Sequence, residues 1–132
     1  MDHHDRYGDE GAATTALVLI LPVVLLTVMV VVQLALAFHA RQVVTAAAQD
    51  AALAATAQGA DPDTAETTAR HVLDVAGSGL LHASSVAVTA DADRVHVTVA
   101  GTVASVVPGL ELTVSGTSDS PIERLRPQEP RP

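Results

Sequence analysis

The sequence predicts an α+β protein anchored to a membrane, with one long N-terminal helix that continues into a small domain containing a second helix and a three-stranded antiparallel sheet. Two observations support this prediction. Residues 16–38 form an uninterrupted apolar run, ALVLILPVVLLTVMVVVQLALAF, and no charged residue lies between Glu10 and Arg41. From Ser84 onward, apolar residues recur at every second position, which is the period of a half-buried strand.

The apolar run is long enough to cross a bilayer, because a helix of about 20 apolar residues spans about 30 Å of hydrocarbon. We therefore predict a transmembrane helix over residues 12–40, with the lipid membrane as a partner. A buried core helix is the alternative, although it would need a larger domain than the rest of the chain can supply. A cleaved secretory signal is a third reading, since Ala35-Leu36-Ala37 resembles a cleavage site that would release a secreted domain beginning at Phe38.

The helix is predicted to continue beyond the membrane over residues 41–59, because this stretch is rich in strong helix formers and contains no Gly or Pro before Gly59. Small residues on one narrow face permit the close approach of another helix or of a sheet. Gln33, deep in the apolar run, is predicted either to hydrogen-bond a partner helix or to lie near the membrane interface. The predicted helix–helix contact residues are Gln33, Val44, Ala48, Ala51 and Ala55.

The α+β domain is predicted over residues 60–118. Asp63, followed by Glu66, has the spacing of a capping box and predicts a second helix that ends near Ala76. Two alternating segments, 85–89 and 94–103, flank a turn at 91–93, and a third strand is predicted to start near Leu110. The sheet is expected to pack on the second helix, on the projecting first helix, or on both. Residues 119–132 are polar and Pro-rich, which predicts a disordered tail.

Composition argues against several function classes. The net charge is −8 and only 2% of the residues are aromatic, which is unsuited to nucleic-acid binding. The chain has no Cys, so disulfides and thiolate metal sites are excluded. The His residues lack metal-ligand spacing and no phosphate-binding Gly loop is present. We therefore predict no enzyme activity, catalytic residue, cofactor, metal or small-molecule substrate.

Several segments resemble type IV pilin-like proteins, and the resemblance is closest to the TadE-like family of actinobacteria, which belongs to the tight-adherence (Flp, type IVb) pilus system. Gly11, a short stretch of small residues and then Leu17–Pro22 resemble the N-terminus of these proteins. The Ala/Gln-rich helix after the apolar run is also similar. Four further segments are similar: Val32–Leu36, His39–Ala40, Val103–Pro108 and Leu112–Ser115. Taken together, the similar segments extend over nearly the whole chain.

The resemblance implies a pilin-like fold and a minor pilin or pseudopilin of a pilus assembly or secretion system. It implies that residues 1–11 are a cytoplasmic leader, which a prepilin peptidase removes by cutting between Gly11 and Ala12. Other pilin-like or assembly subunits would be its partners. Family members usually carry Glu five residues after the cut, where it is thought to pair with a neighbouring subunit's terminal amine, whereas this chain has Ala16.

Prepilin-type proteins are single-pass proteins of the cell membrane and envelope, with a cytoplasmic N-terminus and an extracytoplasmic domain, and we predict the same arrangement here. The four acidic residues before the apolar run and Arg41 after it favour the reverse orientation, but acidic residues count little in such comparisons. The alternative function is that of an uncleaved single-pass membrane protein whose extracytoplasmic domain binds or regulates another envelope component.

Overall fold

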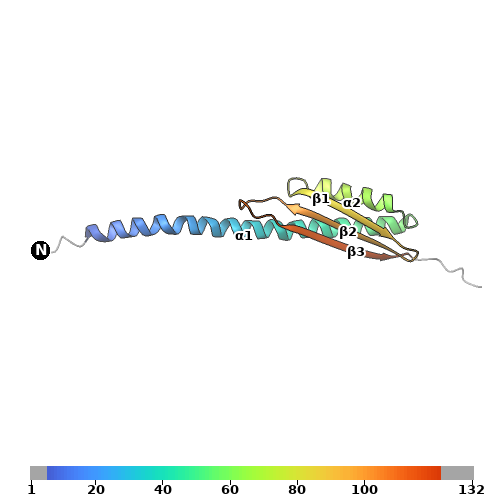
Figure 1. Cartoon of the computed structure of the whole chain (residues 1–132), viewed down its shortest axis with the longest axis horizontal. Helices are drawn as coiled ribbons and strands as arrows, with labels where there is room; N and C mark the ends of the chain where they lie inside the picture. Colours follow the sequence, from blue (N-terminus) through green and yellow to red (C-terminus); the bar gives the residue numbers. More distant parts are fainter. Residues whose placement is uncertain (1–5, 123–132) are drawn as a thin grey trace, which may run out of the picture.

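The computed structural model describes residues 6–122 of the 132. It contains two helices and three strands in the described residues, which confirms the predicted α+β layout (Figure 1). In chain order the elements are α1 (Arg6–Ala57), α2 (Pro62–Ala76), β1 (Leu81–Ala90), β2 (Arg94–Val103) and β3 (Thr113–Pro121).

Helix α1 is a single helix of 52 residues, and α2 and the three strands all pack along its C-terminal half (Figure 1). At 1.5 Å per residue it is about 78 Å long. Pro22 lies inside it without ending it. The hydroxyls of Thr15 and Thr27 each donate to the carbonyl four residues earlier, at 2.9 and 2.8 Å, so these polar groups are satisfied by the helix itself.

One stripe of α1 is buried under the domain. The stripe begins at the half-buried Met29 and continues at intervals of three or four residues, which places its members on one helix face. Most members are Ala, so the helix presents a smooth surface that other elements approach closely. The fully buried members from Gln33 onward are Gln33, Ala40, Val44, Ala47, Ala48, Ala51, Ala52 and Ala55.

The turn between the helices closes α1 with a Schellman motif. Gly59 has a φ of 76°, and the Ala60 N–H donates to the Ala55 carbonyl at 2.9 Å. The predicted stop at Gly59 is therefore confirmed. The predicted cap of α2 is wrong, because Asp61 rather than Asp63 accepts from the first free N–H groups and Pro62 occupies the first turn.

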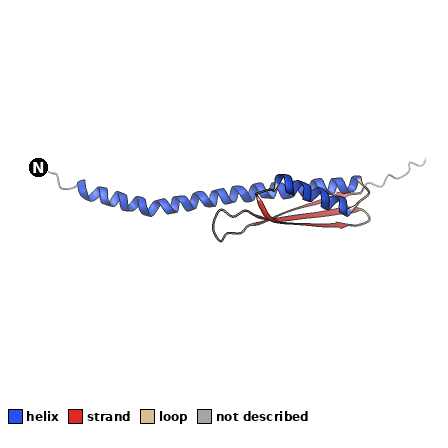
Figure 2. Ribbon diagram, turned by 90° about the horizontal axis from the view of Figure 1, so that it is seen from above, coloured by secondary structure: helices blue, strands red, loops and turns tan. Residues whose placement is uncertain are grey.

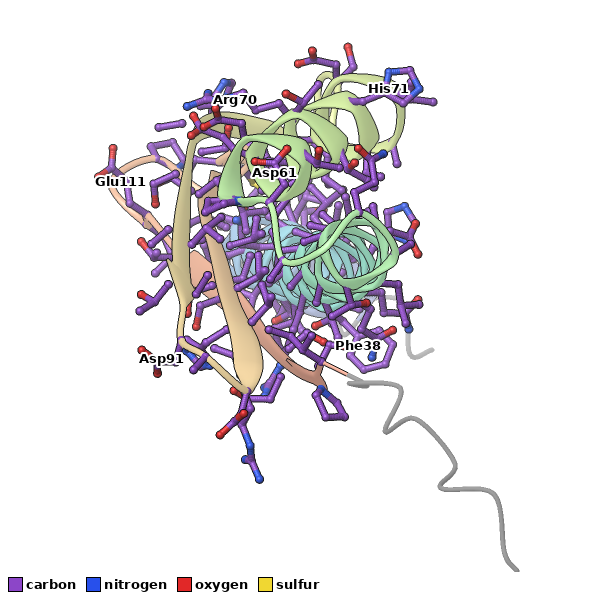
Figure 3. All side chains as sticks on the ribbon, turned by 90° about the vertical axis from the view of Figure 1, so that its right-hand side faces the viewer. Phe38, Asp61, Arg70, His71, Asp91 and Glu111 are labelled. Carbon is purple, nitrogen blue, oxygen red and sulfur yellow. The ribbon has the colours of Figure 1, made fainter. Side chains whose placement is uncertain are left out.

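The sheet is an antiparallel meander in the order β1-β2-β3. Its inner face packs on both helices, with β2 and β3 along α1 and β1 along α2, as the end-on view shows (Figure 3). The view from above shows the strands running alongside the C-terminal half of α1 (Figure 2). Every second residue of β2 is buried in the core: Val95, Val97, Val99, Gly101 and Val103.

Strand β3 differs from the predicted third strand at both ends. It begins at Thr113 and continues to Pro121, into the range assigned to the tail. Its polar residues give little apolar alternation, but they pair in register with β2, from Thr102↔Thr113 to Arg94↔Pro121. Backbone pairing therefore extends this strand where side-chain patterning does not predict it. Residues 123–132 of the predicted tail lie outside the described residues.

Candidate membrane anchor and its junction with the domain

The N-terminal part of the apolar run is uncovered on every side. From Leu17 to Val28, the large apolar side chains are each more than half exposed. Within the described chain, α1 is the one helix long and apolar enough to cross a membrane by length and composition. In water this surface would be strongly unfavourable, at about 25 cal/mol per Å² of exposed apolar area, whereas a bilayer accommodates it. The geometry therefore supports membrane anchoring through α1.

Gln33 marks the point where this exposed segment meets the domain. Its side chain is completely buried, and its hydrogen-bond partners belong to the chain's own domain rather than to a partner helix. Nε2 donates to the Ala104 carbonyl at 3.2 Å, and Oε1 accepts from the Val106 N–H at 2.6 Å. Gln33 thus binds the backbone of the loop between β2 and β3, more than 70 residues away in the chain.

The segment bound by Gln33, residues 104–112, will be called the β2–β3 loop. Pro108 and Gly109 form the centre of a tight turn, in which Gly109 has a φ of 80° and the Leu110 N–H donates to the Val107 carbonyl at 3.1 Å. Ser105 Oγ lies 2.6 Å from the Val107 carbonyl oxygen and 2.9 Å from that of Leu110, so its hydrogen is shared between them. The loop is therefore an ordered unit fixed to the helix.

The small-residue face of α1 is occupied by the chain's own domain. Val44, Ala48, Ala51 and Ala55 are each 0% exposed and form one apolar cluster with residues of α2 and β2. The close approach that the sequence predicts is thus present as an intramolecular contact. A contact between another subunit and α1 would have to use a different face.

Gly116 sets the distance between sheet and helix, although no local sequence pattern predicted this role. A Cβ at this position of β3 would lie only 2.6 Å from the Thr45 Cα of α1. The backbones of β3 and α1 therefore touch directly. The available signal was a glycine at an inward position of a strand, which often marks a close backbone approach.

Another side of α1 is left largely uncovered by the described part of the domain and borders β3 at Thr45. Phe38 is 67% exposed and lies on the side of α1 away from α2 (Figure 3). Together with neighbouring residues it lines a shallow surface, which also includes Arg41, Gln42, Thr45, Ala46 and Gln49. This surface is continuous with the uncovered apolar segment.

The predicted processing residues lie within α1. Gly11 is helical and exposed, with open space where a Cβ would lie, and Ala12 follows it in the same helix. Ala16 is also exposed. The geometry of residues 6–122 is compatible with a cleaved and with an uncleaved chain, so cleavage stays a prediction.

The ionisable groups of the domain lie at its surface. Hydrogen bonding from the Thr64 hydroxyl, aided by the N–H groups of Asp63 and Thr64, lowers the pKa of Asp61 below its usual value of 3.8. On the outer face of the sheet, His96 Nδ1 lies 2.6 Å from Asp119 Oδ1, and both side chains are about half exposed. No group of three or more His, Cys, Asp or Glu that could hold a metal occurs in the part of the chain that the structure describes.

Helix α1, which carries the apolar segment and Gln33, matches a known protein family over most of its length. The family model of TadE-like protein matches residues 11–53. This part of the chain is similar to TadE-like proteins. The match begins at the predicted cleavage position, contains the exposed apolar segment and Gln33, and ends within the buried stripe of α1.

The TadE-like match associates the chain with the tight-adherence pilus. The match does not include Val103–Pro108 and Leu112–Ser115, for which the sequence predicts a resemblance to the family, nor α2 and the sheet. No curated protein and no solved structure matches the chain.

Proposed function

We propose that the protein is a non-enzymatic minor pilin or pseudopilin-like component of a tight-adherence type IVb pilus assembly or secretion system. The observation that carries this proposal is the coincidence of the TadE-like match with a helix that is uncovered and apolar in its N-terminal half and bears a domain on its C-terminal half. In this proposal the N-terminus is cytoplasmic and the domain extracytoplasmic. The partners are the membrane, other pilin-like or assembly subunits, and a prepilin peptidase.

The rigid connection between anchor and domain supports this role. Helix α1 has no break between the apolar segment and the buried stripe, and Gln33 ties the β2–β3 loop to the same helix. A force or displacement applied to the membrane segment is therefore transmitted directly to the domain. Such coupling suits a subunit that is moved or held by an assembly machine.

The free side of α1 is the surface we assign to other subunits. The buried stripe is already covered by the domain, whereas Phe38, Gln42 and Gln49 are exposed on a different side of the helix. A neighbouring helix packed there would bury Phe38, and aromatic side chains contribute strongly to such contacts.

An uncleaved single-pass protein with a binding or regulatory domain is the second candidate, and Ala16 favours it. A terminal amine at Ala12 in an apolar bundle would need a counter-charge, because an unpaired buried charge is strongly destabilising. The chain has no acidic residue between Glu10 and Asp50 to supply one, so the pairing used by the family is absent here.

Intact-mass and N-terminal peptide analysis of the protein from membranes of its native host separates the two candidates. A mature chain beginning at Ala12 supports the pilin-like function, since it requires prepilin peptidase processing. A membrane-bound chain that retains Gly11 and the residues before it supports the uncleaved alternative. A chain that begins at Phe38 outside the membrane contradicts both.

A further inference from the structure

We propose that the β2–β3 loop is a second membrane contact, which rests on the headgroup region of the bilayer where α1 leaves the hydrocarbon. This inference depends on membrane anchoring by α1, as in the proposed function, and adds a lipid-binding surface formed by the domain itself. Its position, its side chains and its internal hydrogen bonds each support it.

The position follows from Gln33. The transmembrane helix predicted over residues 12–40 is shortened here to residues 14–32, because Gln33 and Ala40 are buried under the domain. These 19 residues extend about 28 Å at 1.5 Å each and so match a hydrocarbon core of about 30 Å. Gln33 is the next residue, and its two hydrogen bonds hold Ala104 and Val106 beside it. If the bilayer covers the exposed apolar segment, the loop is fixed at the bilayer surface.

The partly buried face of α1 begins one turn before Gln33, within the membrane-spanning residues. Met29 is half-buried, whereas its neighbours Val28 and Val30 are exposed. Figure 1 shows the loop connecting β2 and β3 reaching past the end of the sheet along α1, in the direction of the N-terminus. The loop is thus the part of the domain nearest the membrane segment.

The loop presents apolar side chains. Val106 is 38% exposed, Pro108 is exposed, and Val107 and Leu110 are half-buried. Glu111 is its one charged residue and lies at the end next to β3. An exposed apolar loop next to a membrane helix is stabilised by contact with the boundary between headgroups and acyl chains.

The loop's backbone is also suited to a region with little water. Unpaired N–H and C=O groups are costly there, and irregular structure is tolerated only where these groups have partners. Ser105, the Leu110 N–H and Gln33 satisfy backbone groups within the loop, while Pro108 has no N–H to satisfy. At its base, the Val103 N–H donates to the Leu112 carbonyl at 2.8 Å.

A membrane contact through the β2–β3 loop would restrict how α1 rotates and tilts in the bilayer. A single helix is free to rotate about its axis and to tilt in a bilayer, whereas a helix with a loop fixed to one side is held in one rotation. The free side of α1, with Phe38, would then face a constant direction in the membrane plane. The loop would in this way orient the surface that we assign to other subunits.

Site-directed spin labelling of the full chain in phosphatidylcholine vesicles tests the inference, and the Cys-free sequence makes single-cysteine variants straightforward. We would label P108C and V106C in the loop, L25C in the membrane segment and V75C, which is 71% exposed on α2. Collisions of each label with oxygen, which is enriched in lipid, are compared with collisions with a nickel chelate, which stays in water.

We expect both loop labels to lose nickel-chelate collisions and gain oxygen collisions relative to V75C, at a depth shallower than L25C. If both loop labels match V75C while L25C is lipid-exposed, the loop contact is wrong and the anchor stands. If L25C is itself water-exposed, membrane anchoring fails and the loop proposal fails with it. The use of two loop positions guards against a local effect of replacing Pro108.

Discussion

Replacing Gln33 with Leu is expected to release the β2–β3 loop from α1 while leaving the helix and the sheet intact. Leu has a similar volume but offers neither the donor for the Ala104 carbonyl nor the acceptor for the Val106 N–H. Each lost hydrogen bond costs about 1 kcal/mol, and a buried donor left without a partner adds about 1 kcal/mol more. We therefore expect the free energy of opening the loop to fall by about 2–3 kcal/mol.

Amide hydrogen exchange measures this opening directly. Because 1.4 kcal/mol corresponds to a factor of ten, exchange of the Val106 amide and of its loop neighbours should accelerate by about 30- to 150-fold in detergent micelles. Amides of β2 that pair with β1 should change little. The matched control is Q49L, which makes the same replacement at an exposed position of the same helix.

Two results would refute this reasoning. Unchanged exchange in the loop of Q33L would mean that Gln33 does not hold it. Equal acceleration in Q33L and Q49L would mean that the effect comes from altering the helix in general, and the junction would lose its assigned role.

Three further predictions concern the domain. G116A should destabilise the domain by about 1–3 kcal/mol in chemical denaturation, because the new Cβ meets the α1 backbone at 2.6 Å. G101A should destabilise it less, because its Cβ meets the flexible Leu81 side chain at 3.0 Å. Equal losses of stability in the two variants would contradict the role assigned to Gly116. A48L should also lower the stability of the domain by about 1–3 kcal/mol, because the larger side chain overfills the buried face of α1. The same change at an exposed position, A46L, should be nearly neutral. A neutral A48L would show that the buried face is loosely packed. The folded-state pKa of Asp61 is lowered, so the stability that this carboxylate contributes is fully present above its unfolded pKa near 3.8 and is lost as the pH falls through the lower folded pKa. Thermal unfolding at successive acid pH values should show this loss of stability. The D61N variant should lose less stability over the same pH range.

The main elements of the fold could be predicted because their signals are local. An uncharged apolar run predicts the membrane segment of α1, and the alternation of Val95, Val97 and Val99 predicts β2. The turn at 91–93 is confirmed, with the Asp91 N–H donating to the Arg94 carbonyl at 2.9 Å. The cap of α2 was misassigned although a signal existed, since Pro at the first helical position favours the preceding Asp61.

The junction could not be predicted from local patterns. The partners of Gln33 lie 71 and 73 residues later, and they are backbone groups that have no residue-specific signature. The contact between Gly116 and Thr45 is equally distant in sequence. Likewise, the small-residue face indicates a close approach but does not say whether a partner subunit or the chain's own domain makes it.

We propose that α1 anchors the protein in the cell membrane and presents the domain on the outer side. Cysteine labelling in intact cells of the native host tests it most directly, with S78C in an exposed turn of the domain and L25C in the apolar segment. We predict that a membrane-impermeant maleimide labels S78C in intact cells, whereas L25C reacts only after the membrane is dissolved and the protein denatured. Labelling of S78C only after lysis, or of L25C in intact membranes, would contradict the account.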